Sequence, residues 1–257
     1  MNLSLNWTND FVDLSGIDAK TYCDRLTATG SKVEGYEVLG EDIENVVAGK
    51  VISLERHPDS DHLWVCQIDI GEAEPVQIVT GAQNVYAGAL VPVAKAPSKL
   101  PGGVNIKAGK LRGVPSNGML CSIGELNLTT HDMPGAIEDG IFIMNDSGID
   151  CKPGDDIHKV LDLSDTVVEF EITSNRPDCL SVIGLARETA VSFERKFTLP
   201  TPKVTFKNDG DKVDNYLSVE VKDSKLCPRY TARVVKNVKI APSPLWLRMR
   251  LRASGVR

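Results

Sequence analysis

The sequence is poor in aromatic residues and has no closely spaced pair of cysteines. Aromatic side chains make up 5% of the 257 residues, so few surfaces are available for stacking single-stranded bases. The six cysteines are scattered, and none forms a C-x-x-C pair of the kind that builds zinc sites. No apolar run is long enough to span a bilayer, and the N-terminus does not have the pattern of a secretory signal. We therefore expect reduced thiols, a cytoplasmic location and no membrane partner.

Acidic residues are missing from two long segments of an otherwise acidic chain. The formal net charge is −6, yet residues 75–124 contain no acid and five bases, and residues 224–257 contain no acid and nine bases. The bases of the first segment are Lys95, Lys99, Lys107, Lys110 and Arg112. Two basic blocks on an acidic chain favour a localised anion-binding surface, although solvated strand and helix faces would give the same pattern.

Strand and helix signals change along the first 200 residues. Residues 1–38 combine a short strand with helices. Residues 39–153 are short β-rich runs between Gly, Pro, Asn and Asp turns, which is typical of a small closed barrel. Mixed structure returns in residues 154–200, where Asp178 or Ser181 can cap a helix. A small barrel flanked by α+β segments is therefore predicted.

The C-terminal part begins with a Pro- and Asp-rich linker. After this linker, alternating patterns predict strands over residues 216–223 and 229–240. In the last segment Ser243 is a candidate helix cap, Pro244 suits the first helical position and Gly255 is a stop signal. Because little sequence follows this helix, we expect that the chain ends soon after a new domain begins.

Two histidines and a cysteine lie close together in HPDSDHLWVC. Taken as metal ligands, His57, His62 and Cys66 lack the fourth ligand that a structural zinc site needs. In a strand, Cys66 would share a face with Trp64 and Ile68, which predicts a small buried hydrophobe. The two histidines flank PDSD, a predicted hairpin loop. A metal site, or a hydrolase that uses one, is therefore a minor alternative.

The main alternative is that this hairpin belongs to a barrel that binds nucleic acid. In small five-stranded barrels, oligonucleotides lie across one strand face and its flanking loops. The segment KLRGVPSNGMLCS offers bases for phosphates and small polar residues for sugar or base edges. Taken alone, its PSNG tetrapeptide is more typical of a β-turn. Composition therefore leaves a binding barrel and a purely structural barrel both open.

Motifs along the chain resemble a known family. HPDSDHLWVCQIDIG, QIVTGAQNV, IKAGKLRGVPSNGMLCS and EDGIFIM are similar to the tRNA-binding OB-type domain. The flanking LSLNWTNDFVDL, VEFEITSNRPDCLSVIGLARE and PRYTARVVKNVKIAPSPLWLRMRLRASGVR resemble the beta subunit of the bacterial phenylalanyl-tRNA synthetases. The resemblance covers nearly the whole chain and is weakest in residues 200–225.

This resemblance implies an α+β architecture. An OB-type barrel, residues 39–153, would be inserted into a discontinuous α+β domain formed by residues 1–38 and 154–200. A linker over residues 201–215 would lead to the truncated start of an α/β editing domain at 216–257. That last segment would contain the helix with Arg248, Arg250 and Arg252.

The resemblance also implies a function. The parent would be a class II aminoacyl-tRNA synthetase that charges tRNA with phenylalanine, using ATP and magnesium, in an assembly of two alpha and two beta chains. The aminoacylation site would lie on the alpha subunit. The present chain alone would therefore be inactive, with no cofactor, catalytic residue or metal site of its own. Its partners would be phenylalanine-specific tRNA and the alpha subunit, and not DNA.

The expected tRNA contact lies in the barrel. We expect backbone charge from the five bases of residues 75–124 and a contact loop shaped by three further residues, Ser116, Asn117 and Met119. Asn175 and Arg176, in the motif SNRPD, are interpreted as a structural strand-to-helix turn. Because residues 39–153 carry eight bases against fifteen acids, we expect weak affinity from this part alone.

Two other functions remain as alternatives. A stand-alone tRNA-binding or chaperone-like protein would end near residue 153 and dimerise through the barrel, and the flanking motifs disfavour it. A purely structural assembly module would keep its affinity for tRNA, if it has any, when the basic block is reversed in charge.

Overall fold

The computed structural model describes residues 1–202 and 211–256. It divides into two compact units, one formed by Met1–Leu199 with Ser243–Arg257 and the other by Pro200–Pro242. None of the helices in the described ranges is long and apolar enough to cross a membrane. The predicted linker, 201–215, falls largely on residues 203–210, which lie outside the described residues.

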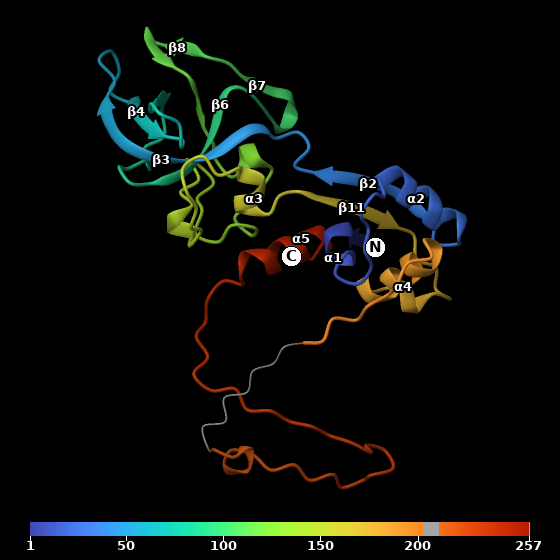
Figure 1. Ribbon diagram of the computed structural model, residues 1–257. Helices are drawn as coiled ribbons and strands as arrows, with labels where there is room; N and C mark the ends of the chain where they lie inside the picture. The colour runs from blue at the N-terminus through green and yellow to red at the C-terminus, as the bar shows by residue number, and fades with distance from the viewer. Residues whose placement is uncertain (203–210, 257) are drawn as a thin grey trace. The chain divides into compact units, whose positions relative to one another are not determined.

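A small antiparallel sheet forms one end of the first unit (Figure 1). Its strand order is β1–β11–β2, with β1 over Asn2–Ser4, β2 over Val33–Leu39 and β11 over Asp165–Phe170. The helices that accompany it are α1 (Leu5–Thr8), α2 (Ala19–Ala28) and α4 (Val182–Ser192). Leu3, Leu26, Phe170 and Leu185 form its core. The chain thus leaves this sheet after β2 and returns to it in β11.

The residues between β2 and β11 build a second, larger sheet. Its path is β10–β6–β3–β4–β5, with β7 paired to β6. The strands are β3 (Glu44–Arg56), β4 (Trp64–Asp69), β5 (Val76–Thr80), β6 (Leu90–Leu100), β7 (Val104–Ile106) and β10 (Gly118–Leu120). Buried residues on its inner face include Val51, Cys66, Ile68, Ile78 and Val93. The alternation that predicted a buried Cys66 is confirmed, since this side chain is 0% exposed.

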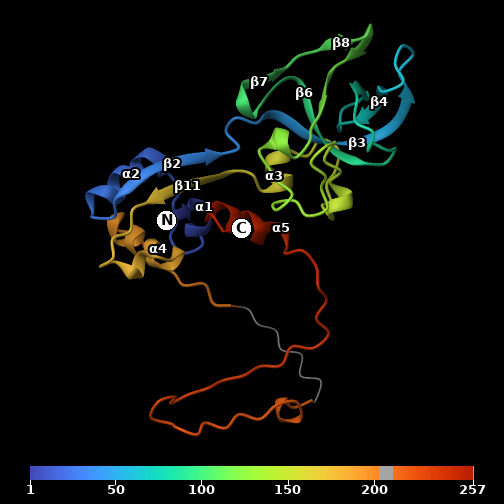
Figure 2. The same cartoon turned by 180° about the vertical axis from the view of Figure 1, so that it is seen from behind.

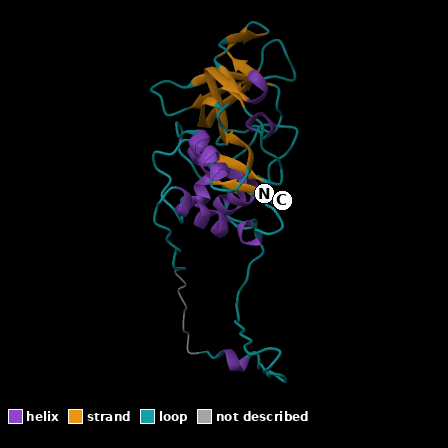
Figure 3. Ribbon diagram, turned by 90° about the vertical axis from the view of Figure 1, so that its right-hand side faces the viewer, coloured by secondary structure: helices purple, strands orange, loops and turns teal. Residues whose placement is uncertain are grey.

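This sheet curls until its two edges approach each other. The Asn117 N–H, just before β10, donates to the carbonyl of Gln77 in β5 at 2.9 Å. The Val79 N–H donates to Ser116 Oγ at 3.0 Å. The structure therefore confirms a mixed α and β chain with a curled antiparallel sheet. The closed OB-type barrel and its insertion into a second domain stay predictions. Figure 3 shows that this part is mostly strand and loop, whereas the helices gather around the small sheet.

Short helical segments complete the first unit. They are η1 (Pro101–Gly103), η2 (Gly124–Leu126), η3 (Asn145–Ser147), α3 (Ile157–Leu161) and η4 (Pro177–Cys179). A further core, built around Phe142, Met133 and Met144, includes residues of β3 and β6 and Ile157 of α3. This core also contains Met249, which lies in the C-terminal helix.

The C-terminal helix, α5 (Leu245–Ala253), belongs to the first unit. Arg250 pairs with Asp10 at 2.6 Å and Arg252 with Asp132 at 3.5 Å, so these arginines are engaged by acids of the same unit. The helix is where the sequence predicted it, but Ser243 does not cap it. The N-cap is Pro244, and the carbonyl of Ser243 accepts a hydrogen bond from Arg248 Nε at 2.9 Å.

The second unit differs from its prediction. Among the described residues of Pro200–Pro242 only η5 (Val213–Asn215) is helical and none is in a strand. The strands predicted over 216–223 and 229–240 are therefore wrong for this structure. A strand needs a neighbouring strand for its backbone hydrogen bonds, and the described residues offer none to these segments. Their apolar side chains, such as Val235 and Ile240, are exposed.

Candidate nucleic-acid interface

A separate two-stranded hairpin carries the middle of the basic segment. Among the described strands, β8 (Gly109–Leu111) and β9 (Val114–Ser116) pair only with each other, and Leu111 faces Val114. The two turn residues, Arg112 and Gly113, have φ of 43° and 85°. Positive φ at both positions gives the turn whose twist matches a β-hairpin. Figures 1 and 2 place β8 at the end of the curled sheet far from β2 and β11.

A groove of about 780 Å³ lies beside this hairpin. It is bordered by the end of β5, by β7 and β8, by β10 and by residues 138–141. Four of the predicted contact residues line it: Lys107, Lys110, Ser116 and Met119. Lys95, Lys99, Arg112 and Asn117 do not line it. The groove therefore includes only half of the eight residues that were predicted to contact tRNA.

The five predicted bases differ in what they contact. Lys107 and Lys110 are exposed, and neither makes an ion pair with any residue that the structure describes. Lys95 pairs with Glu72 at 3.1 Å and Lys99 with Glu44 at 2.6 Å. Exposed pairs of this kind contribute only about 0–1 kcal/mol, so they reduce the local positive charge without fixing the side chains.

Arg112 is held at the hairpin tip. Its Nη1 donates to the carbonyl of Asp59, in the loop between β3 and β4, at 3.2 Å. A non-glycine residue in the left-handed region costs roughly 1–2 kcal/mol, so other contacts must stabilise this turn. Arg112 therefore presents its charge next to the groove and not inside it.

The three predicted loop residues have distinct environments. Ser116 is 9% exposed, and its hydroxyl accepts from the Val79 N–H and donates to the Gly118 carbonyl at 3.2 Å. Asn117 is exposed and Met119 is half-buried. Ser116 thus shapes the loop by closing the curled sheet, while Asn117 and Met119 keep side-chain surface for a partner.

Acidic residues, which the predicted contact set does not contain, also line the groove. They are Glu125, Glu138 and Asp139. Asn84 fixes the segment that carries the last two, because its side-chain amide accepts from the Ile141 N–H at 3.1 Å and donates to the Ile141 carbonyl at 2.8 Å. In the sequence, the motif EDGIFIM could have indicated these acids, because it begins with Glu138 and Asp139. Three carboxylates in the same groove as two exposed lysines predict modest affinity for a polyanion.

The residues of the metal hypothesis do not form a site. Within the described ranges the one group of three potential cation ligands is Asp178, Cys179 and Glu188, so His57, His62 and Cys66 are not brought together. Burial raises the pKa of the Cys66 thiol to about 11. A thiol that stays protonated at neutral pH is a poor metal ligand and a poor nucleophile.

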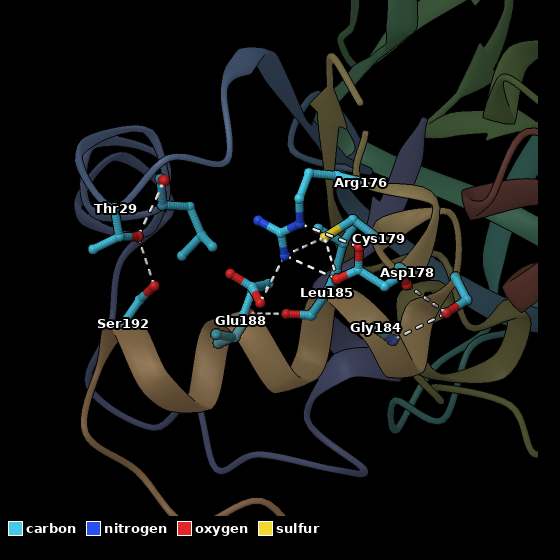
Figure 4. A network of polar contacts seen from close by, with 11 residues as sticks. Thr29, Arg176, Asp178, Cys179, Gly184, Leu185, Glu188 and Ser192 are labelled. Carbon is cyan, nitrogen blue, oxygen red and sulfur yellow. Dashed lines mark hydrogen bonds and ion pairs between the residues drawn. The ribbon is translucent and has the colours of Figure 1, made fainter. Parts of the chain in front are cut away.

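The Asp178 group is filled by a guanidinium (Figure 4). Arg176 Nη2 lies 2.9 Å from Asp178 and 2.8 Å from Glu188, and it also contacts Cys179 Sγ at 3.1 Å. This guanidinium holds the pKa of the Asp178 carboxyl at about 2. The motif SNRPD therefore has a structural contact network at the start of α4, as its interpretation as a turn requires.

Comparisons with known proteins point to one family. Residues 46–141, which include the hairpin and the groove, match the family described as "Putative tRNA binding domain". Over its whole length the chain is 49% identical to the phenylalanine–tRNA ligase beta subunit of Clostridium acetobutylicum and 50% identical to that of Clostridium tetani. This chain is homologous to the phenylalanine–tRNA ligase beta subunit.

The chain spans 31% of the length of these phenylalanine–tRNA ligase beta subunits. A solved structure, the C-terminal domain of Plasmodium vivax p43, is 26% identical over 32% of this chain and 46% of its own length. Its TM-score of 0.25 is too low to bear on the fold. The homology therefore rests on sequence, and the groove lies inside the part that matches the tRNA-binding family.

Proposed function

We propose that this chain supplies the tRNA-binding part of a phenylalanine–tRNA ligase beta subunit. The observation that carries the proposal is the position of the groove. Two exposed lysines, Lys107 and Lys110, line it, and it lies within residues 46–141, which match a tRNA-binding family. Lysines of this kind neutralise phosphates, while Met119 and Leu111 give apolar surface against which an unstacked base can lie.

In this proposal, residues 39–153 are an OB-type barrel inserted into a domain of residues 1–38 and 154–200. The pairing of β2 with β11 supports the insertion, since these strands flank the curled sheet in sequence and share another sheet. We also propose that an editing domain begins at 216–257. Only the family resemblance supports this, since α5 packs in the same unit as β1.

The whole protein would be a cytoplasmic class II aminoacyl-tRNA synthetase that uses ATP and magnesium to charge tRNA with phenylalanine. Identity of about half over the full chain supports this assignment. The aminoacylation site would lie on an alpha subunit in an assembly of two alpha and two beta chains. The Asp178 group does not fit magnesium, because Arg176 already fills it. No catalytic step is therefore assigned to this chain.

The proposal is tested by fluorescence-anisotropy titration of labelled phenylalanine tRNA. The variant Lys107→Glu/Lys110→Glu is compared with Lys20→Glu/Lys196→Glu, which makes the same change of charge at exposed lysines outside the curled sheet. We expect the first variant to bind more weakly and the second to bind like the unchanged protein. The slope of log affinity against log salt should fall by about one for each phosphate that the variant no longer neutralises.

Equal binding by both variants and the unchanged protein would show that the groove is not the contact. The second candidate function, a structural assembly module, would then be favoured. That candidate is supported by the mixed charge of the groove, which is lined by three acids and two lysines.

A further inference from the structure

His57 joins the loop between β3 and β4 to the basic hairpin. Its Nε2 lies 3.1 Å from the carbonyl of Leu111 in β8, 54 residues away in sequence. Its Nδ1 accepts the Asp59 N–H at 3.0 Å. Because Nδ1 is an acceptor, the neutral ring carries its proton on Nε2 and donates it to Leu111. The ring thus connects two loops with its two nitrogens.

The hairpin needs such a connection because its strands pair only with each other among the strands described. At its base it is attached through the carbonyl of Pro115, which accepts from Gln77 Nε2 at 2.8 Å, and through the Ser116 hydroxyl. At its tip, two of its residues contact the β3–β4 loop, Leu111 through His57 and Arg112 through the Asp59 carbonyl. Without the tip contacts, the hairpin would be free to pivot about its base.

His57 is itself fixed and shielded. The side chain is 3% exposed, so it cannot touch an RNA that lies on the surface. Its backbone N–H donates to the Leu63 carbonyl at 3.1 Å and its carbonyl accepts from Ser60 at 3.3 Å. The β3–β4 loop is therefore closed around His57, and any effect of this residue on RNA must pass through the hairpin.

We infer that His57 is a positioning residue that holds the hairpin so that Lys110 and Arg112 meet tRNA phosphates. The inference rests on the proposed function. It explains why a histidine is placed in a loop without a metal: both ring nitrogens are used, one to shape the loop and one to hold the hairpin.

The test compares His57→Asn with His57→Gln in the full chain. The asparagine amide oxygen can replace Nδ1 as the acceptor for Asp59, but asparagine is too short to reach Leu111. The glutamine amide can replace Nε2 as the donor to Leu111. The matched control is His62→Asn, because the ring of His62, in the same loop, makes no hydrogen bond within the described residues and only its backbone does.

Three measurements are made on each variant: affinity for labelled phenylalanine tRNA, its salt slope, and hydrogen exchange at the Leu111 and Val114 amides. Loss of one hydrogen bond predicts about three- to tenfold weaker binding for His57→Asn. We also expect a smaller salt slope and faster exchange at both amides. His57→Gln should lie between this variant and the unchanged protein, and His62→Asn should match the latter.

Failure of the inference is distinguishable from failure of the proposed function. If the unchanged protein does not bind tRNA, the proposed function fails, whatever His57 does. If it binds, and Lys110→Glu weakens binding while His57→Asn binds and exchanges like the unchanged protein, the positioning role is overturned. Equal effects of the asparagine and glutamine variants overturn it as well, since the bond to Leu111 is then not the cause.

Discussion

Replacement of Ser116 by alanine tests whether this residue closes the curled sheet or contacts RNA directly. Its hydroxyl accepts the Val79 N–H between the two edges of the curled sheet, in a part where Val79 is also buried. Alanine would leave this amide without a partner, which costs about 1–3 kcal/mol. We therefore expect Ser116→Ala to lower the free energy of unfolding by about 2 kcal/mol, measured by urea denaturation of the chain.

The neighbouring Asn117→Ala is the matched control. Asn117 contacts β5 only through its backbone N–H, and its side chain is exposed, so its replacement should change stability by less than about 0.5 kcal/mol. If Ser116→Ala unfolds at the same urea concentration as Asn117→Ala but binds tRNA more weakly, closure of the sheet by Ser116 would be refuted. Ser116 would then be a direct RNA contact.

Other expectations follow from buried or crowded groups. A Cβ at Gly184 would lie 1.8 Å from the Asp178 carbonyl oxygen. Gly184→Ala should therefore lower the free energy of unfolding, measured by urea denaturation, by about 3 kcal/mol or more. A variant as stable as the unchanged protein would contradict the packing of α4 on η4. The pKa of Asp178 is lowered to about 2 by Arg176, so this carboxylate stabilises the fold above its unfolded pKa of about 3.9, and the contribution is lost as pH falls towards 2. Asp178→Asn should remove that part of the pH dependence, and an unchanged acid transition in urea would argue against the pair. Burial raises the pKa of Cys66 to about 11 and of Cys121 to about 12. A thiol reagent at pH 8 should therefore modify these two cysteines only after unfolding. Rapid modification of either one in the native chain would contradict their burial.

Local patterns predicted much of the fold. Short β-rich runs gave the curled sheet, and strand alternation placed Cys66 inside it because neighbouring side chains on a strand alternate in direction. Ser181 was one of two candidate caps for α4, and the structure selects it, since its hydroxyl accepts the Gly184 N–H at 3.0 Å. These features depend on residues a few positions apart, and such relations can be read along the chain.

The candidate site was predicted only in part, because its details depend on distant contacts. Charge alone could not show that Lys99 has a partner 55 residues away, or that Ser116 turns its hydroxyl towards β5. The acids of residues 138–141 enter the groove through Asn84, 57 residues away from the backbone it holds. The strands expected after residue 215 failed for a related reason, since alternation marks a suitable strand but does not supply its neighbour.

The pairing of β2 with β11 sets a condition on how the chain folds. Leu39 faces Asp165, and closing a flexible loop of about 125 residues costs roughly 4 kcal/mol in entropy. Val47 and Asp156, however, meet in a bridge at the base of the curled sheet. Once that sheet has formed, only about 15 flexible residues separate the two strands and the cost falls to roughly 2.5 kcal/mol. During synthesis the curled sheet can therefore form before β11 is available. The formed curled sheet then speeds the pairing of β2 with β11, because it shortens the flexible loop between these strands.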